Sequence, residues 1–292
     1  MYTENDWWCY LAHHGIKNQE WGVQNGPPYP LDTSEHNRII AGVDDSKRRM
    51  RIKNETEGWI KRFTQKDEKK YFQQNPVEQI DNMRKIQDGS DIHKIRYGIN
   101  HGGTDAGRHY NCPNCAAAFD MVERGYDVIA RPKANGSNVG DIEKLFVGSK
   151  LDHVGKEELD PEVYKAYKKY GSKTDVGRLT KYDKLWYEEA GRTEAALMNQ
   201  LRSQKVGERG IVVVGWRENE DPSERTTLFH AINYKIEKDG PTFYDTQSRH
   251  DYDGYKDSLW IIEDCDPREV FMMKTTDLEP SSNIGRFVHS RR

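Results

Sequence analysis

Hydrophobic residues in this chain follow two spacings, one typical of helices and one typical of strands. Between residues 45 and 100, apolar side chains recur at helical intervals in a charged background, which predicts one or two amphipathic helices. From residue 112 to 123, small and apolar residues follow one another almost without interruption. This run predicts a buried helix, and Arg124-Gly125 after it is a typical helix end.

The pattern changes after residue 210, where apolar runs rich in β-branched residues predict strands. Glu237-Lys238-Asp239-Gly240 between two of these runs is a typical hairpin turn. The expected strands and further apolar runs lie at 211–216, 226–236, 242–244, 260–262 and 270–273, with a short strand at 126–132 and a helix at 193–201. Helices followed by an antiparallel sheet predict an α+β fold.

Composition narrows the class of protein. The chain has 292 residues, a net charge of −3 and 32% charged residues, and it holds no apolar run of the roughly 18 residues that a membrane span needs. A basic run at 47–53 lacks interleaved aromatic residues, so we expect a solvated helix face and no binding to nucleic acid. Residues 1–35 do not resemble a signal peptide, and four cysteines are too few for a disulfide scaffold. We therefore expect a reducing cytoplasm.

The candidate chemistry begins at Asn111-Cys112-Pro113-Asn114-Cys115. Proline is favoured at the first helical position, so Cys112 is expected at the N-cap of the buried helix. The unpaired N–H groups of a first helical turn stabilise a thiolate, which is the reactive form of cysteine. Cys112 is therefore the candidate nucleophile, and the main-chain N–H groups beside it are the expected donors to an oxyanion.

A cysteine nucleophile needs a base and a group that orients the base. His230 lies in the expected strand 226–236 and Asp245 directly follows the strand 242–244. Their separation corresponds to one strand, one tight turn and one strand back, which can place the carboxylate beside the imidazole. Taken singly, each residue is as well explained by a structural role, but the set of three favours a catalytic site.

Other interpretations of the cysteine pair remain open. Cys115 is the alternative nucleophile, because Cys115-Ala116-Ala117-Ala118-Phe119 is similar to the run around the active cysteine of papain-type proteases. A zinc knuckle would need Cys9 or Cys265 together with His109, and no second paired motif supports it. A redox dithiol lacks the strand that precedes the motif in thioredoxin. Cys9 with His13 and His14 matches no standard zinc spacing, so we expect no metal and no cofactor.

Two stretches resemble known families. His13-His14-Gly15-Ile16-Lys17 with Trp21-Gly22-Val23 resembles a motif of phage structural proteins and phage-encoded effectors. The second resemblance, over roughly residues 95–280, is to the papain-fold toxin (Tox-PL, glutamine-deamidase-like) family. The motifs that carry it are Asn111-Cys112-x-x-Cys115 with Ala118, Arg124-Gly125-Tyr126-Asp127-Val128 with Ala130, His230-Ala231 and Asp245-Thr246-Gln247.

The second resemblance implies a papain-like core with Cys112 as nucleophile, His230 as base and Asp245 as orienting group. Gln247 and Asn111 would support the site. Composition predicts a docking segment rich in aromatic residues, glycine and proline at 1–35 and a charged helical region at 36–98. The resemblance adds a papain-like catalytic domain at 99–292, with an insertion at about 133–205.

The implied function is that of a thiol amidohydrolase, a phage- or prophage-encoded toxin that deamidates glutamine in a target protein. The alternatives are a cysteine protease of the same fold and a non-catalytic virion or interaction protein. The expected partners are a protein substrate and, through residues 1–35, a phage virion or delivery machinery, with no nucleic acid and no membrane. The expected location is the cytoplasm of a bacterial host cell, or a phage particle that carries the protein.

Overall fold

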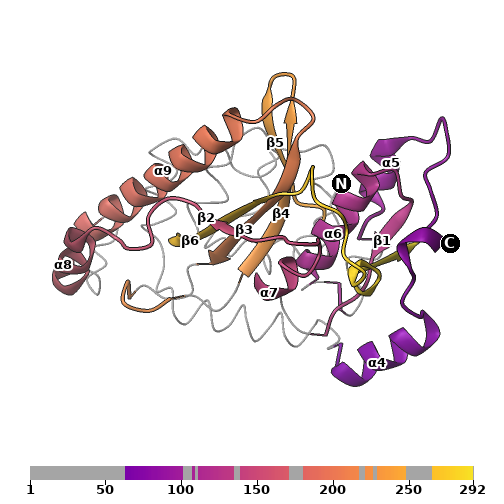
Figure 1. Ribbon diagram of the computed structural model, residues 1–292. Helices are drawn as coiled ribbons and strands as arrows, with labels where there is room; N and C mark the ends of the chain where they lie inside the picture. The colour runs from indigo at the N-terminus through magenta and orange to yellow at the C-terminus, as the bar shows by residue number, and fades with distance from the viewer. Residues whose placement is uncertain are drawn as a thin grey trace, which may run out of the picture.

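Part of the chain is described by a computed structural model (Figure 1). The described residues are 63–100, 107–108, 111–134, 139–170, 180–216, 221–225, 229–247 and 265–291. The expectations for residues 1–62, among them the docking segment and Cys9 with its neighbouring histidines, lie outside these ranges, as does the apolar run at 260–262. The three described cysteines, Cys112, Cys115 and Cys265, are buried free thiols.

A five-stranded antiparallel sheet forms the centre of the fold, in the order β2-β6-β3-β4-β5. The strands expected at 211–216, 242–244 and 270–273 and the hairpin turn are confirmed, as is the described part, from residue 229, of the strand expected at 226–236. The sheet consists of β2 (Asp152–His153), β3 (Arg209–Trp216), β4 (Phe229–Glu237), β5 (Gly240–Tyr244) and β6 (Cys265–Lys274). Gly210 allows β3 and β6 to approach, because a Cβ at this position would lie 2.1 Å from the carbonyl oxygen of Met273.

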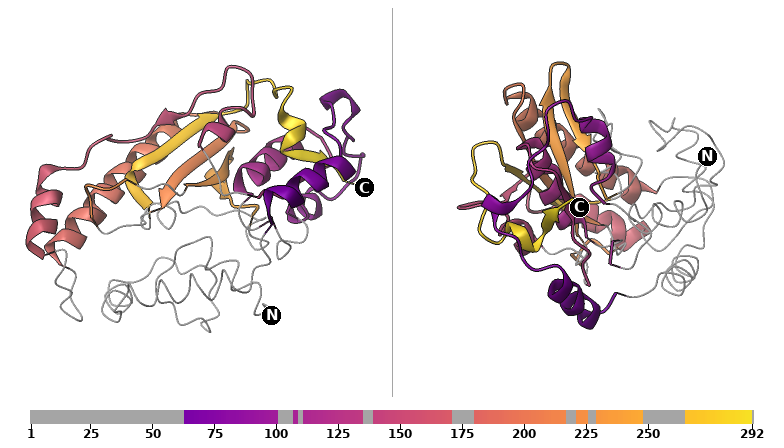
Figure 2. Two further views of the ribbon diagram at one scale, coloured as in Figure 1. Left: turned by 90° about the horizontal axis from the view of Figure 1, so that it is seen from below. Right: turned by 90° about the vertical axis from the view of Figure 1, so that its right-hand side faces the viewer.

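The two faces of the sheet are covered by different helices, α6 (Cys112–Glu123) and α9 (Lys181–Arg202) (Figures 1 and 2). Side chains alternate between the faces along a strand. Ile211 and Val213 of β3 belong to the buried cluster around α6, whereas Val212 and Val214 belong to the cluster under α9. The expected α+β fold is therefore present, with apolar cores on both faces of the sheet.

The helix expected at 193–201 is wrong in its start, because α9 begins twelve residues earlier at Lys181. Thr180 and Asp183 form a capping box there, in which each side chain accepts a bond from the other residue's backbone N–H. The tyrosine- and tryptophan-rich first turns of α9 bury Tyr182 and Trp186 against α8 (Pro161–Tyr170). The described residues of the segment 133–205, which we expected to be an insertion, form the helices α7, α8 and α9 and also the strand β2, which pairs with β6.

A second, two-stranded sheet joins β1 (Val128–Ala130) to β7 (Val288–Ser290). The short strand expected at 126–132 is therefore confirmed. The described N-terminal and C-terminal segments meet around this sheet, at the end of the molecule opposite α8 (Figure 2). The remaining elements are α4 (Gln65–Gln74), η1 (Ile80–Asn82), α5 (Ile92–Tyr97), α7 (Val139–Ile142) and η2 (Ile284–Arg286).

The side chain of Arg131 ties this end of the molecule together. Its guanidinium is completely buried and donates to the carbonyl oxygens of Asn75, Pro76 and Val288 at 2.7, 2.8 and 3.0 Å. It also lies over the ring of Phe72. Burial lowers the pKa of Arg131 from its usual value. One cation therefore holds the segment after α4 and the strand β7 against β1.

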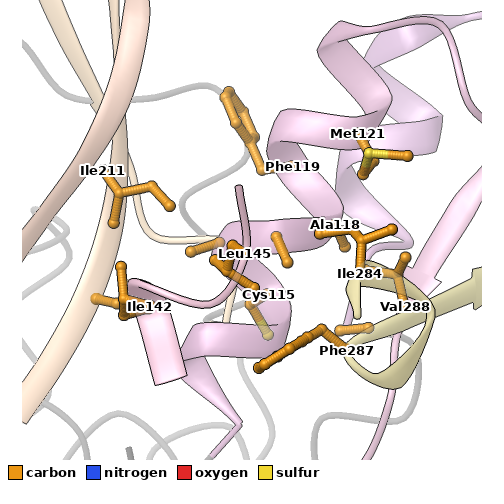
Figure 3. Close-up of a cluster of buried hydrophobic side chains, with 14 of the residues drawn as sticks. Cys115, Ala118, Phe119, Met121, Ile142, Leu145, Ile211, Ile284, Phe287 and Val288 are labelled. Carbon is orange, nitrogen blue, oxygen red and sulfur yellow. The ribbon is translucent and has the colours of Figure 1, made fainter. Parts of the chain in front are cut away.

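Helix α6 is the most deeply buried helix of the described chain, and eleven of its twelve residues are buried. Figure 3 shows side chains of this helix packed among residues from β3, α7 and the C-terminal segment. Small alanine side chains allow the helix backbone to approach the sheet closely. The helix ends at Glu123, and Gly125 takes the left-handed conformation expected after a helix end, with φ of 85°.

A buried carboxylate fixes α6 to the sheet. Asp120 accepts from Arg124 Nε at 2.5 Å, Arg209 Nε at 3.0 Å and Thr275 Oγ1 at 2.6 Å. These partners come from the end of α6, from β3 and from the residue that follows β6.

In the described ranges, no helix combines the length and the apolar character that a membrane span requires.

We predict that Asp120→Ala lowers the free energy of unfolding by about 3–5 kcal/mol, because it leaves two arginines in a partly buried site without their carboxylate. Urea unfolding followed by circular dichroism measures the change. The matched control is Asp277→Ala, which removes an exposed partner of Lys274 and should change stability little. Equal effects of the two substitutions would contradict the anchoring role of Asp120.

Candidate active site

The β4–β5 hairpin brings His230 and Asp245 together as the sequence spacing predicts. His230 Nε2 lies 2.8 Å from Asp245 Oδ2, and both side chains are buried. Burial alone would lower the pKa of His230, but the Asp245 carboxylate and the sulfur of Cys112 outweigh it and raise the pKa to about 10. The imidazole is therefore held in its protonated form at neutral pH, with Nε2 committed to the carboxylate.

Cys112 lies at the start of α6, beside the first residues of β4. Its Sγ is 4.0 Å from the carbonyl oxygen of Phe229, and its sulfur is close enough to His230 to raise the pKa of the imidazole. The expected N-cap position is wrong by one residue, because Asn111 is the cap and Cys112 is the first helical residue. Pro113 fits equally well at the second position, where a backbone N–H is also not needed by the helix.

Cys115 occupies a different environment one turn further along the helix. It is buried in the apolar cluster of Figure 3, and its Sγ donates to Asn111 Oδ1 at 3.4 Å. Burial raises the pKa of the Cys115 thiol well above its usual value, and the nearby charges of Cys112 and Asp245 raise it further. A protonated, enclosed thiol is a poor nucleophile.

The two supporting amides expected from the sequence, Asn111 and Gln247, lie in one buried network. Asn111 Nδ2 donates to the carbonyl oxygen of Arg131 at 3.1 Å, and its Oδ1 accepts from Gln247 Nε2 at 3.5 Å. The backbone N–H of Gln247 donates to Asp245 Oδ1 at 3.2 Å. Both buried residues therefore adjoin the site: Asn111 directly precedes Cys112, and Gln247 contacts Asp245.

Sequence reasoning missed Trp216 as part of the site. Its ring stacks on the imidazole of His230, with ring centroids 5.6 Å apart and planes at 27°. The pairing of β3 with β6 shifts register between Val214 and Trp216, and such bulges re-aim a side chain. The face of an aromatic ring attracts a neighbouring cation, so Trp216 favours the protonated imidazole. The local sequence around Trp216 contains no pattern that predicts this contact.

The geometry corrects the expected oxyanion donors. The backbone N–H groups of Asn114 and Cys115 both donate to the carbonyl oxygen of Asn111, at 2.8 and 3.0 Å, and Pro113 has no N–H. These three residues of the first turn therefore do not provide a donor to a substrate oxygen. Among the described side chains, no group of three or more histidine, cysteine, aspartate or glutamate residues is arranged to hold a metal ion.

The arrangement can deliver a sulfur nucleophile to an acyl carbon and a proton to the leaving group, which is acyl-transfer chemistry. A family model described as "papain fold toxin 1, glutamine deamidase" matches residues 110–250. This segment of the chain is similar to the papain-fold toxin family. No curated protein and no solved structure matches the chain.

The match to the papain-fold toxins confirms the expected family, the papain-like fold and a cysteine-dependent hydrolase of the glutamine deamidase kind. A toxin deamidase acts on a protein substrate. The matched segment starts just before α6 and continues beyond β5, so it contains Cys112, His230 and Asp245. The resemblance of residues 13–23 to phage proteins stays a prediction, since those residues lie outside both the match and the described ranges.

We predict a pH dependence of stability from the pairing of His230. Its pKa is about 10 in the folded protein against an ordinary value of 6.5, so the pairing stabilises the fold fully below about pH 6.5. This contribution is lost as the pH rises through about 10. The free energy of unfolding, measured with urea at a series of pH values, should fall over this interval.

Asp245→Asn is the matched variant for this measurement, because it removes the charge that raises the pKa and retains the shape of the side chain. The fall in the free energy of unfolding between pH 6.5 and 10 should be smaller in this variant. Identical pH profiles of the two proteins would contradict the ion pair.

Proposed function

We propose that this protein deamidates glutamine side chains of a target protein through Cys112, His230 and Asp245. The observation that carries the proposal is the buried His230–Asp245 pair next to Cys112 at the start of α6. A structural histidine would not need a buried carboxylate and a neighbouring thiol together. The family of residues 110–250 supports the substrate group, a carboxamide.

In the first half of the reaction, the Cys112 thiolate attacks the side-chain carbonyl carbon of glutamine. The first helical turn favours negative charge at the sulfur, and the His230 imidazolium next to it supplies the counter-charge. As the tetrahedral intermediate collapses, His230 gives its proton to the leaving nitrogen. Ammonia departs, and a thioester between Cys112 and the substrate remains.

In the second half, water attacks the thioester. His230, now neutral, accepts a proton from the water, and the products are a glutamate side chain and the free Cys112 thiolate beside the imidazolium. Because Nε2 faces Asp245, Nδ1 is the nitrogen that we assign to these proton transfers. Asp245 holds the ring in this orientation and stabilises its positive charge.

We predict that Cys112→Ala abolishes deamidation and leaves the fold intact. Cys115→Ala serves as the matched control, since its thiol is protonated and enclosed and its loss should leave most of the activity. Proteins of bacterial cells that express either variant are compared by mass spectrometry for conversion of glutamine to glutamate. Conversion by the Cys112 variant but not by the Cys115 variant would move the nucleophile to Cys115.

The same experiment separates deamidation from proteolysis. A deamidase changes the mass of a glutamine-containing peptide and leaves the chain whole, whereas a protease produces new chain ends that depend on Cys112.

Asp245→Asn should lower the rate by at least about 100-fold, because an amide orients the imidazole but does not stabilise its charge. A rate equal to that of the parent protein would refute the assignment of Asp245.

We further propose that residues 1–35 dock the protein to a phage particle or a delivery machinery, from which it reaches the cytoplasm of a bacterial cell. The support is sequence alone, namely Trp7, Trp8 and Trp21 among glycine and proline, because aromatic residues are enriched at partner surfaces.

We predict that removal of residues 1–35 preserves deamidation and lowers the melting temperature by less than about 10 °C. The measurements are thermal unfolding and the mass-spectrometric assay of glutamine conversion. A larger loss of melting temperature would show that the segment belongs to the fold.

A further inference from the structure

A buried amide lies between the start of α6 and the chain that follows β5. Asn100 is only 2% exposed, and its side chain makes three hydrogen bonds. Its Nδ2 donates to the carbonyl oxygens of Gln247 at 2.9 Å and Arg108 at 3.2 Å, and its Oδ1 accepts from Asn111 Nδ2 at 3.1 Å. Both N–H groups of the amide are therefore used, along with its oxygen.

The two ends of this bridge adjoin the two halves of the proposed site. Asn111 directly precedes Cys112 in the chain. Gln247 follows Asp245 by two residues, and its backbone N–H donates to Asp245 Oδ1. Asn100 thus connects the backbone next to the nucleophile with the loop that holds the carboxylate partner of His230. The path from Asn111 to Gln247 through Asn100 uses two hydrogen bonds of ordinary length.

Asn100 is itself held in a defined position. The preceding residue, Ile99, is completely buried, and its carbonyl oxygen accepts from the backbone N–H of Ala130 in β1 at 2.9 Å. This pairing fixes the turn after α5 against the two-stranded sheet. Asn100 also lies outside the segment 110–250 that matches the toxin family. A residue supplied by the N-terminal flank therefore contacts residues that adjoin Cys112 and Asp245.

An apolar side chain of similar volume would remove the hydrogen bonds to the carbonyl oxygens of Arg108 and Gln247 and to Nδ2 of Asn111, and losing buried hydrogen bonds is costly. What an amide adds is direction, since it accepts from one segment and donates to two others. Small displacements of reacting groups reduce rates strongly. A bridge that sets the position of Cys112 relative to His230 and Asp245 would act on the reaction even though it contacts no substrate.

We propose that Asn100 is a positioning residue, which fixes the start of α6 and the loop after β5 at the separation that pairs Cys112 with His230. This inference rests on the proposed function for its meaning, but its test does not require the target protein. The probe is iodoacetamide, which reacts with the thiolate form of cysteine. Peptide mapping by mass spectrometry reports the alkylation of Cys112 separately from that of the other cysteines.

The test compares the parent protein with Asn100→Asp and Asn100→Ala. Aspartate keeps the shape of the side chain but turns an acceptor toward the carbonyl oxygens of Arg108 and Gln247. The matched control is Thr193→Val, which removes one buried hydrogen bond, to the carbonyl oxygen of Pro267, under α9 and away from the site. All four proteins are assayed at a temperature at which each is folded.

In the parent protein and in Thr193→Val, Cys112 should be alkylated rapidly and with little pH dependence through neutral pH, as expected for a thiolate paired with an imidazolium. In both Asn100 variants, the rate at neutral pH should fall about tenfold or more, and the profile should become that of an ordinary thiol, rising above about pH 8. Folded Asn100 variants with the parent profile would overturn the proposal.

Two other outcomes also decide the matter. If neither Asn100 variant folds, Asn100 is a determinant of stability and the positioning role is rejected. If Cys112 of the parent protein itself behaves as an ordinary thiol, the proposed catalytic pair fails and the positioning role fails with it. The first of these outcomes leaves the proposed function standing, so the two failures are distinguishable.

Discussion

The burial of helix α6, of which eleven of twelve residues are buried, is the constraint on which the rest of this structure depends. A buried helix must satisfy each of its polar groups within the protein, because none of them reaches water. Asp120 is neutralised by Arg124 and Arg209, and the amide of Asn114 donates to the carbonyl oxygen of Arg131 at 2.7 Å. Arg124 caps the end of α6 itself, whereas Arg209 comes from β3 and Arg131 is the residue after β1. The helix therefore fixes the sheet and the small β1–β7 unit at the same time.

The same constraint separates the two cysteines. Cys115 points into the apolar cluster, where its thiol stays protonated and serves as a donor to Asn111. Cys112 lies at the N-terminal end of α6, next to the protonated His230. Both cysteines are buried, but they have different neighbours: burial raises the pKa of the Cys115 thiol, whereas Cys112 lies beside the imidazole of His230.

The parts of the site that sequence reasoning found are those with a local signal. The run of small residues predicted α6, and the hairpin turn at 237–240 predicted the approach of His230 to Asp245. Trp216 and Asn100 have no local signal, because a bulge between β3 and β6 places the first and a turn after α5 places the second. The early start of α9 had a local signal, the capping box from Thr180. The apolar face of the first turns of α9 is explained only by its packing against α8.

The segment that matches the family model does not contain all the strands of the two sheets. Strand β6 follows residue 250, yet it lies inside the sheet between β2 and β3, so the matched segment alone lacks an interior strand. Strand β7 also lies beyond the match and completes the β1 sheet, where Arg131 joins it to the chain after α4. The carbonyl oxygen of that same arginine accepts from Asn111, the residue before Cys112. Both flanks of the matched segment are therefore connected to the nucleophile, and they belong to its scaffold.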